Sequence, residues 1–101
     1  MDQKKIVIAD AGEEFRRLLA ELIESEADLT VVGETADGAE LIELCRQHQP
    51  DIVVMDMILS TLDGVDALTQ LGELTPKPRV LVLSSFAGGS VAELAAARGA
   101  D

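Results

Sequence analysis

The stretch Ile52-Val53-Val54-Met55-Asp56 decides the fold, because it joins the most continuous apolar run of the chain to a carboxylate. A short run rich in β-branched residues is typical of a strand that is buried on both faces of a parallel sheet. The apolar Met57-Ile58-Leu59 follows, and a carboxylate in such surroundings costs on the order of several kcal/mol unless it is paired, protonated or metal-bound. The stretch therefore predicts a central strand with a functional carboxylate at its end.

The rest of the chain alternates short apolar runs with amphipathic stretches, which predicts βα units around a parallel sheet. We expect strands at Ile6–Ala9, Leu29–Gly33, Ile52–Met55 and Val80–Leu83. We expect helices from about Glu13 to Glu26, from Asp37-Gly38 to the break at Pro50-Asp51, from about Val65 to Glu73, and from Gly88-Gly89-Ser90 to Gly99. The pattern predicts one α/β domain over residues 1–101. The domain is expected to be incomplete at its C-terminus, because Arg98-Gly99-Ala100-Asp101 reads as a helix end before a further strand.

Composition restricts the class of protein. The chain has 101 residues, a formal net charge of -11 and only 8 Lys and Arg residues, so we expect no nucleic-acid binding by this segment. Its apolar runs are too short to span a membrane, and the N-terminus lacks the layout of a signal peptide. The single Cys45 cannot form an internal disulfide, which fits a reducing compartment. We therefore expect a cytoplasmic domain that does not contact a membrane.

The expected strand ends carry Asp10 (first), Gly33-Glu34 (second), Asp56 (third) and Ser84-Ser85 (fourth). In open α/β sheets, ligands bind beyond the carboxyl ends of the strands, at the point where the strand order reverses. An oxygen-rich cluster suits Mg²⁺, which takes one or two carboxylates and keeps several waters. A carboxylate can also act as a nucleophile and form an acyl phosphate. The pattern favours an acidic site for metal and phosphate chemistry.

Simpler interpretations of these residues stand beside this one. Asp10 precedes an expected helix and is about as well explained as a turn former or a helix cap. Asp63-Gly64 is typical of a turn, and Ser84 is able to cap the segment that follows it. Asp56 is harder to explain in this way, because apolar residues surround it on both sides in the sequence.

His48 and Cys45 have ordinary explanations that outweigh functional ones. His48 lies at the expected end of the second helix, where solvation and the helix dipole favour it, so we do not interpret it as a phosphate donor. Cys45 shares the inner face of that helix with Leu41 and Ile42 and is expected to behave as a small hydrophobe.

These residues also carry a resemblance to the receiver domains of response regulators that extends over essentially the whole chain. The similar segments are Ile6-Val7-Ile8-Ala9-Asp10, Val53-Val54-Met55-Asp56-Met57, Asp63-Gly64, Leu81-Val82-Leu83-Ser84 and Arg98-Gly99-Ala100-Asp101. Within the family, a run of the D-G-x-E-L type and the Leu62-Asp63-Gly64 loop most resemble the receiver of stage 0 sporulation protein A. The resemblance implies a flavodoxin-like doubly wound parallel sheet that lacks its final βα unit.

The resemblance implies roles for individual residues. Asp56 would accept phosphate from a histidine kinase or a phosphotransferase, and Ser84 would bind a phosphoryl oxygen as the switch hydroxyl. Asp10, Asp56 and the backbone carbonyl of Ile58 would hold Mg²⁺. The implied activity is signalling in a two-component system or phosphorelay, with a link to sporulation and transcription, and no enzymatic reaction. Any DNA binding would belong to a C-terminal domain of the parent protein.

The sequence departs from the family pattern at three places. Ala11 stands where receivers usually carry a second acidic residue, so Mg²⁺ binding is expected to be weaker. Glu13 or Glu14 would have to replace that ligand, although acidic residues in the first turn of a helix are expected in any case. Ser60 replaces the proline of the phosphoacceptor loop, and the lysine that follows the fifth strand would lie beyond Asp101.

Two other functions compete with phosphate-dependent signalling. A degenerate receiver would use the same fold as an interaction domain that takes no phosphate, and Ala11 favours it. A small Mg²⁺-dependent phosphohydrolase also uses an aspartate after a strand, but Ile58 stands where its second carboxylate would be expected. Fold alone does not decide among these functions.

Overall fold

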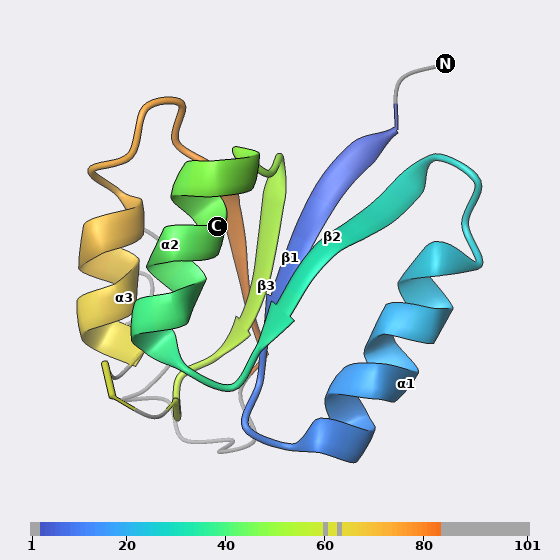
Figure 1. Ribbon diagram of the computed structural model, residues 1–101, viewed down its shortest axis with the longest axis horizontal. Helices are drawn as coiled ribbons and strands as arrows, with labels where there is room; N and C mark the ends of the chain where they lie inside the picture. The colour runs from blue at the N-terminus through green and yellow to red at the C-terminus, as the bar shows by residue number, and fades with distance from the viewer. Residues whose placement is uncertain (1–2, 60, 63, 84–101) are drawn as a thin grey trace.

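A computed structural model describes residues 3–59, 61–62 and 64–83, which form an α/β fold (Figure 1). The elements follow one another as β1 (Lys4–Ala9), α1 (Glu13–Glu24), β2 (Leu29–Thr35), α2 (Gly38–His48), β3 (Ile52–Asp56), α3 (Gly64–Leu71) and β4 (Arg79–Leu83). All strand pairs are parallel, in the order β2-β1-β3-β4. The predicted α/β class and parallel sheet are confirmed. The expected helix from Gly88-Gly89-Ser90 to Gly99 lies outside the described residues.

Helices cover both faces of the sheet, so it is doubly wound. α1 lies on one face, and α2 and α3 lie side by side on the other (Figure 1). Because side chains alternate along a strand, β1 contributes to both cores. Val7 and Ala9 belong to the core under α2 and α3, and Ile6 and Ile8 belong to the core under α1. Among the described residues, no helix is long and apolar enough to cross a bilayer.

β1 and β3 form the middle of the sheet, and apolar residues fill them. Val53, Val54 and Met55 are buried, as the continuous apolar run predicted, while Ile52 is half-buried at the start of β3. The two strands pair from Ile6 with Ile52 to Ala9 with Met55, so their carboxyl ends are level with each other. This register fixes which residues meet at the carboxyl edge of the sheet.

Several element boundaries differ from the prediction, and for β2 and α1 the reason can be identified. β2 extends to Thr35 and not only to Gly33, because Glu34 and Thr35 continue the pairing with Ile8 and Ala9. α1 ends at Glu24 and not at Glu26, because the Ser25 hydroxyl donates to the Leu22 carbonyl over 2.6 Å and occupies an acceptor of the last turn. α3 likewise begins at Gly64 and ends at Leu71, shorter than the predicted helix from Val65 to Glu73.

The apolar positions of α1 divide between two faces of that helix. Ala20 is buried, and Leu19 and Ile23 pack against the core beneath α1. Phe15, Leu18 and Leu22 are exposed, with Leu22 68% accessible. Periodicity therefore located the helix correctly, but it did not separate the side chains that the sheet covers from those that it leaves in solvent.

The contrast between Leu41 and Leu22 gives a test of the core. Leu41 is 0% exposed beneath α2, so Leu41→Ala leaves a cavity and is expected to cost about 2–5 kcal/mol of the free energy of unfolding. Leu22→Ala makes the same chemical change on the exposed face of α1 and is expected to alter it by no more than about 0.5 kcal/mol. Urea denaturation followed by circular dichroism measures both values, and equal losses would contradict this assignment of the core.

Candidate functional site

The strand order reverses between β1 and β3, and two carboxylates lie at that point. From β1 the chain crosses to β2 on one side and returns through α2 to β3 on the other. Asp10 follows Ala9, and Asp56 follows Met55, which are partners in the parallel ladder. Because neighbouring strands lie about 4.8 Å apart, the two carboxylates emerge side by side at the carboxyl edge of the sheet. We call this part of the sheet, with Asp10 and Asp56, the acidic edge. This is where open α/β sheets bind their ligands.

Asp10 is buried, with 7% of its surface exposed, and the surrounding backbone fixes it. Its N–H donates to the carbonyl of Thr35 over 3.0 Å, which ties the end of β1 to the end of β2. Its Oδ1 accepts a hydrogen bond of 2.8 Å from the N–H of Gly12, the residue that precedes α1. The same aspartate therefore shapes the turn into α1 and lies at the acidic edge, so the two interpretations from the sequence are compatible.

Asp56 is half-buried at the end of β3 and points into the loop that follows. Its Oδ1 accepts a hydrogen bond of 3.3 Å from the N–H of Ile58. The Ile58 side chain is half-exposed, while Met57 beside it is buried in the core. The loop therefore runs over the acidic edge at Ile58, which keeps the backbone of this residue next to the Asp56 carboxylate.

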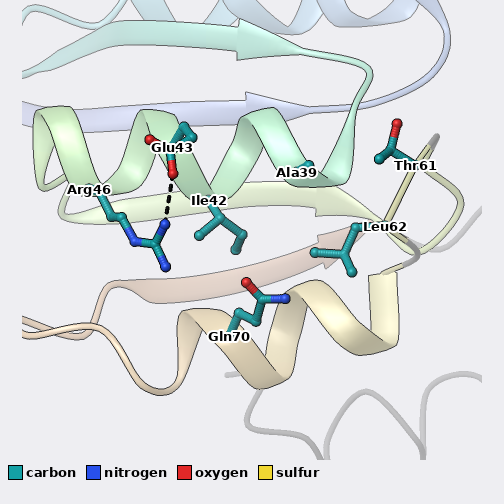
Figure 2. Close-up of a pocket in the computed structure, with 7 residues that line it drawn as sticks. All are labelled: Ala39, Ile42, Glu43, Arg46, Thr61, Leu62 and Gln70. Carbon is teal, nitrogen blue, oxygen red and sulfur yellow. Dashed lines mark hydrogen bonds and ion pairs between the residues drawn. The ribbon is translucent and has the colours of Figure 1, made fainter.

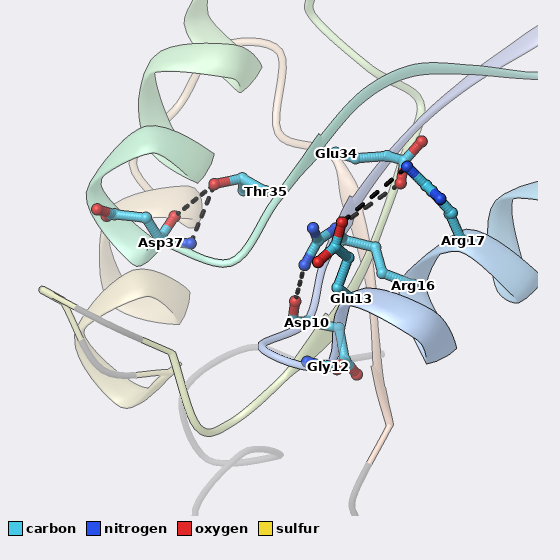
Figure 3. Close-up of polar contacts among 8 residues, drawn as sticks. All are labelled: Asp10, Gly12, Glu13, Arg16, Arg17, Glu34, Thr35 and Asp37. Carbon is cyan, nitrogen blue, oxygen red and sulfur yellow. Dashed lines mark hydrogen bonds and ion pairs between the residues drawn. The ribbon is translucent and has the colours of Figure 1, made fainter.

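Arg16 of α1 contacts Asp10 and Glu34, which lie at the ends of β1 and β2 (Figure 3). Its Nη1 donates to the carbonyl of Asp10 over 2.6 Å, and its Nε lies 3.7 Å from Oε1 of Glu34 at the end of β2. The second distance is that of an ion pair and is too long for a hydrogen bond. The Arg16 side chain is only 17% exposed, so its positive charge lies in a mostly buried place next to the end of β1. Arg17 differs, because it is 75% exposed and contacts only the surface carboxylate of Glu13 at 4.0 Å among the ion pairs of the described residues.

The donor set of this edge fits a weakly held divalent cation. Two carboxylates and a nearby backbone carbonyl are oxygen ligands of the kind that Mg²⁺ takes while it keeps several waters. Within residues 3–59, 61–62 and 64–83, no group of three or more His, Cys, Asp or Glu side chains is placed to hold a metal ion. Ala11 is exposed beside Asp10 and supplies no ligand through its side chain. An ion at this edge would therefore depend on few protein ligands.

The predicted site residues have different outcomes. Asp10, Asp56 and Ile58 lie at the same edge of the sheet, but their roles in metal and phosphate chemistry stay predictions. Ser84 lies outside the described residues; Leu83, the last described residue of β4, pairs with Asp56.

The interpretations of His48 and Cys45 agree with their surroundings. His48 ends α2 at the opposite end of the strands, where its carbonyl accepts a hydrogen bond of 2.7 Å from Nζ of Lys5. Cys45 is buried in the core beneath α2, and this burial raises the pKa of its thiol to about 12. An un-ionised, buried thiol is a poor nucleophile, as expected from its position on the helix.

Two features of this region were not predicted. Arg16 gave no signal in the sequence, because an arginine on an amphipathic helix is ordinarily solvated. Asp37-Gly38 was predicted to open the second helix, but no capping role was assigned to Asp37, whose Oδ1 accepts from the N–H groups of Ala39 and Glu40 at 2.7 and 3.2 Å. An aspartate followed three residues later by Glu40 is the spacing of a capping box, so a signal for this cap existed.

A hollow of about 310 Å³ lies between α2 and α3 (Figure 2). Its lining consists of Ala39, Ile42, Glu43, Arg46, Thr61, Leu62 and Gln70. Glu43 and Arg46 form an ion pair of 2.7 Å beside it, and Thr61 and Leu62 belong to the loop that follows Asp56. The hollow therefore adjoins the loop of the acidic site without containing Asp10 or Asp56.

An open α/β sheet with two carboxylates at its point of reversal defines a class of acidic, ligand-binding domains, and comparison with known proteins specifies the family. Residues 6–101 match the response regulator receiver domain, and the chain belongs to this family. It is 33% identical over 82 residues to the transcriptional regulatory protein LiaR of Bacillus subtilis. It is 35% identical over 82 residues to the response regulator protein VraR of Staphylococcus aureus.

The likeness extends to the backbone. The signal receiver domain of NarL from Mycobacterium tuberculosis matches with a TM-score of 0.93 at 26% identity, over 99% of this chain and 81% of that one. The matches to LiaR and VraR each cover 81% of this chain but only 39% of the relative, so the chain spans about two fifths of their length. These relatives do not confirm the expected similarity to stage 0 sporulation protein A.

Arg16 and Arg17 provide a matched test of whether the contacts of Arg16 with Asp10 and Glu34 stabilise the fold. Arg16→Met removes a charged donor from a carbonyl in a mostly buried place, and we expect the free energy of unfolding to fall by about 1–3 kcal/mol. Arg17→Met removes a solvated arginine from the same helix and is expected to change it by about 0.5 kcal/mol or less. Denaturant unfolding measures the free energy of unfolding of both variants. An Arg16→Met variant as stable as Arg17→Met would show that the Arg16 contacts contribute nothing to stability.

Proposed function

We propose that this receiver domain accepts a phosphoryl group on Asp56 and transmits a signal through the change that follows. The carrying observation is the position of Asp56, which ends the central strand β3 directly beside Asp10 at the reversal of strand order. Membership in the receiver family supports a two-component or phosphorelay system, with a histidine kinase or a phosphotransferase as the donor.

The proposed reaction moves one phosphoryl group between two proteins. An oxygen of the ionised Asp56 carboxylate attacks the phosphorus of a phosphohistidine, a P–O bond forms, and the P–N bond breaks with its electron pair returning to the imidazole. The hydrogen bond from the Ile58 N–H orients the Asp56 carboxylate at the carboxyl edge of the sheet. Catalysis of this step rests mainly on positioning and on neutralisation of charge.

Charge neutralisation at the acidic edge is assigned to few groups. Asp10, Asp56 and the carbonyl of Ile58 would hold Mg²⁺, which when bound neutralises charge on the phosphoryl oxygens. Because the Ala11 side chain supplies no ligand, we expect a lower Mg²⁺ affinity than an acidic residue at this position would give. Loss of a supporting group typically costs about 10–100-fold in metal affinity. Ser84 is proposed as the switch hydroxyl, because it follows Leu83, the β4 partner of Asp56.

The function of the parent protein is also a proposal. LiaR is named a transcriptional regulatory protein, and we infer that this receiver likewise controls transcription from the cytoplasm through a DNA-binding region outside residues 1–101. The receiver itself, with a formal net charge of -11, has the wrong sign for binding nucleic acid and is not proposed to be an enzyme. A role in sporulation is not part of this proposal, since the relatives give it no support.

Acetyl phosphate with Mg²⁺ tests the phosphoacceptor directly. We expect intact-mass measurement to show one added phosphoryl group on the wild-type chain and none on Asp56→Asn, because the amide is not a nucleophile for this reaction. Asp28→Asn is the matched control: Asp28 is exposed and precedes β2 at the opposite end of the strands, so this variant should be phosphorylated like the wild type.

The other outcomes separate the competing functions. A wild-type chain that gains no phosphate at any Mg²⁺ concentration would contradict the proposal and favour the degenerate receiver that Ala11 suggested. Continuous release of inorganic phosphate without an adduct would favour a phosphohydrolase. An adduct that persists in Asp56→Asn would move the acceptor to another residue.

A further inference from the structure

We propose that Asp37 and Thr61 are positioning residues for the phosphoacceptor loop, the segment between β3 and α3 that follows Asp56. The Thr61 hydroxyl donates to Oδ2 of Asp37 over 2.9 Å, and the two residues are 24 positions apart in the sequence. Neither touches the acidic edge; they act through the loop that carries Ile58. This inference rests on the proposed function, since it assigns to the pair a part in phosphate acceptance.

Two hydrogen bonds orient the Asp37 carboxylate, so that it can serve as an anchor for the loop. Its Oδ1 accepts two N–H groups at the start of α2, so the carboxylate is oriented before Oδ2 receives the Thr61 hydroxyl. The Thr61 hydroxyl, followed by the N–H of Glu40, keeps the pKa of the Asp37 carboxyl below its usual value. The anchor therefore stays ionised at neutral pH, and a hydrogen bond to a charged acceptor is stronger than one between neutral groups.

Thr61 adopts an unfavourable backbone conformation that contacts with other residues must stabilise. Its φ is 67°, in the left-handed region, which β-branched residues rarely enter. Such a conformation persists only where surrounding contacts determine it. Within the described residues, the Thr61 hydroxyl donates its hydrogen bond to Asp37, which joins this strained residue to the capped end of α2.

Backbone contacts on either side of Thr61 bring the loop against the same helix. Gly38 begins α2, and a β-carbon added there would lie 1.9 Å from the carbonyl oxygen of Leu62, so only glycine permits this approach. At the base of the loop, the N–H of Gly64 donates to the carbonyl of Met57 over 2.9 Å. Backbone contacts thus fix the loop at its base and where it meets α2. The Thr61 side chain adds a polar contact to Asp37, the residue that caps α2.

The same end of α2 is connected to Asp10. Figure 3 shows Thr35 beside Asp37: the N–H of Asp37 donates to Oγ1 of Thr35 over 3.0 Å. The carbonyl of Thr35 in turn accepts the N–H of Asp10 over 3.0 Å. One set of hydrogen bonds therefore relates Asp10 to the loop that carries Ile58. We infer that Asp37 and Thr61 keep the Ile58 carbonyl in register with the Asp10 and Asp56 carboxylates.

The test compares three threonine variants of the full chain in a Mg²⁺ titration of phosphorylation by acetyl phosphate, with intact mass as the readout. Thr61→Val keeps the branched shape but loses the donor, and we expect the Mg²⁺ concentration for half-maximal rate to rise about 3- to 10-fold. Thr61→Ser restores the hydroxyl and should return that value to within about twofold of the wild type. Thr69→Val is the control, because the Thr69 hydroxyl donates to Val65 within α3.

A second variant examines the other partner. Asp37→Ser keeps an N-cap side chain for α2 but removes the oxygen that receives Thr61. We expect it to raise the Mg²⁺ requirement as Thr61→Val does, and the double variant to show no further rise, because both changes break one interaction. Additive effects of the two substitutions would contradict a shared role.

Thermal unfolding of each variant separates positioning from general destabilisation. The inference requires the Mg²⁺ requirement of Thr61→Val to rise at temperatures where the protein stays folded. A shift that appears only where the variant unfolds, or one that Thr69→Val reproduces, would overturn it.

Failure of the proposed function would be visible separately. If the wild-type chain takes no phosphate, hydrogen exchange of the Gly64 amide still tests the hold on the loop. Faster exchange at Gly64 in Thr61→Val than in Thr69→Val supports the positioning by Asp37, and equal exchange overturns it.

Discussion

The parallel pairing of β1 with β3 is the constraint on which the rest of the structure depends. It brings Asp10 and Asp56, 46 residues apart in the numbering, to neighbouring strand ends. The pairing is stable because both strands are apolar and covered on both faces, by α1 on one side and by α2 and α3 on the other (Figure 1). A shift of register would separate the carboxylates and expose core residues, so packing and site geometry are specified together.

The acidic edge is tolerated because backbone donors surround it. The N–H of Gly12 binds Asp10, the N–H of Ile58 binds Asp56, and Arg16 holds a positive charge against the end of β1. These contacts reduce the cost of gathering carboxylates without cancelling their charge completely. The edge thus keeps a negative character, as the proposed Mg²⁺ site requires.

Much of the fold was predictable, because apolar runs and helical periodicity are local signals. The strand from Ile52 and the inner face of α2 at Leu41, Ile42 and Cys45 were predicted correctly. The exposed face of α1 was not separable from its buried face, since burial depends on which strands lie beneath the helix. At the site, the position of Asp56 followed from the pattern, whereas the contacts of Arg16 and Thr61 depend on segments brought together only by the fold.

Titration of the ¹⁵N-labelled chain with Mg²⁺, followed by NMR, tests most directly whether Asp10 and Asp56 form one site. We predict that the amide signals of Gly12 and Ile58, which bind the two carboxylates, shift along one common binding curve. Signals of Lys5 and Asp51, which pair at the opposite end of the strands, should stay in place. Separate binding curves for Gly12 and Ile58, or shifts no larger than those of Lys5 and Asp51, would contradict the account.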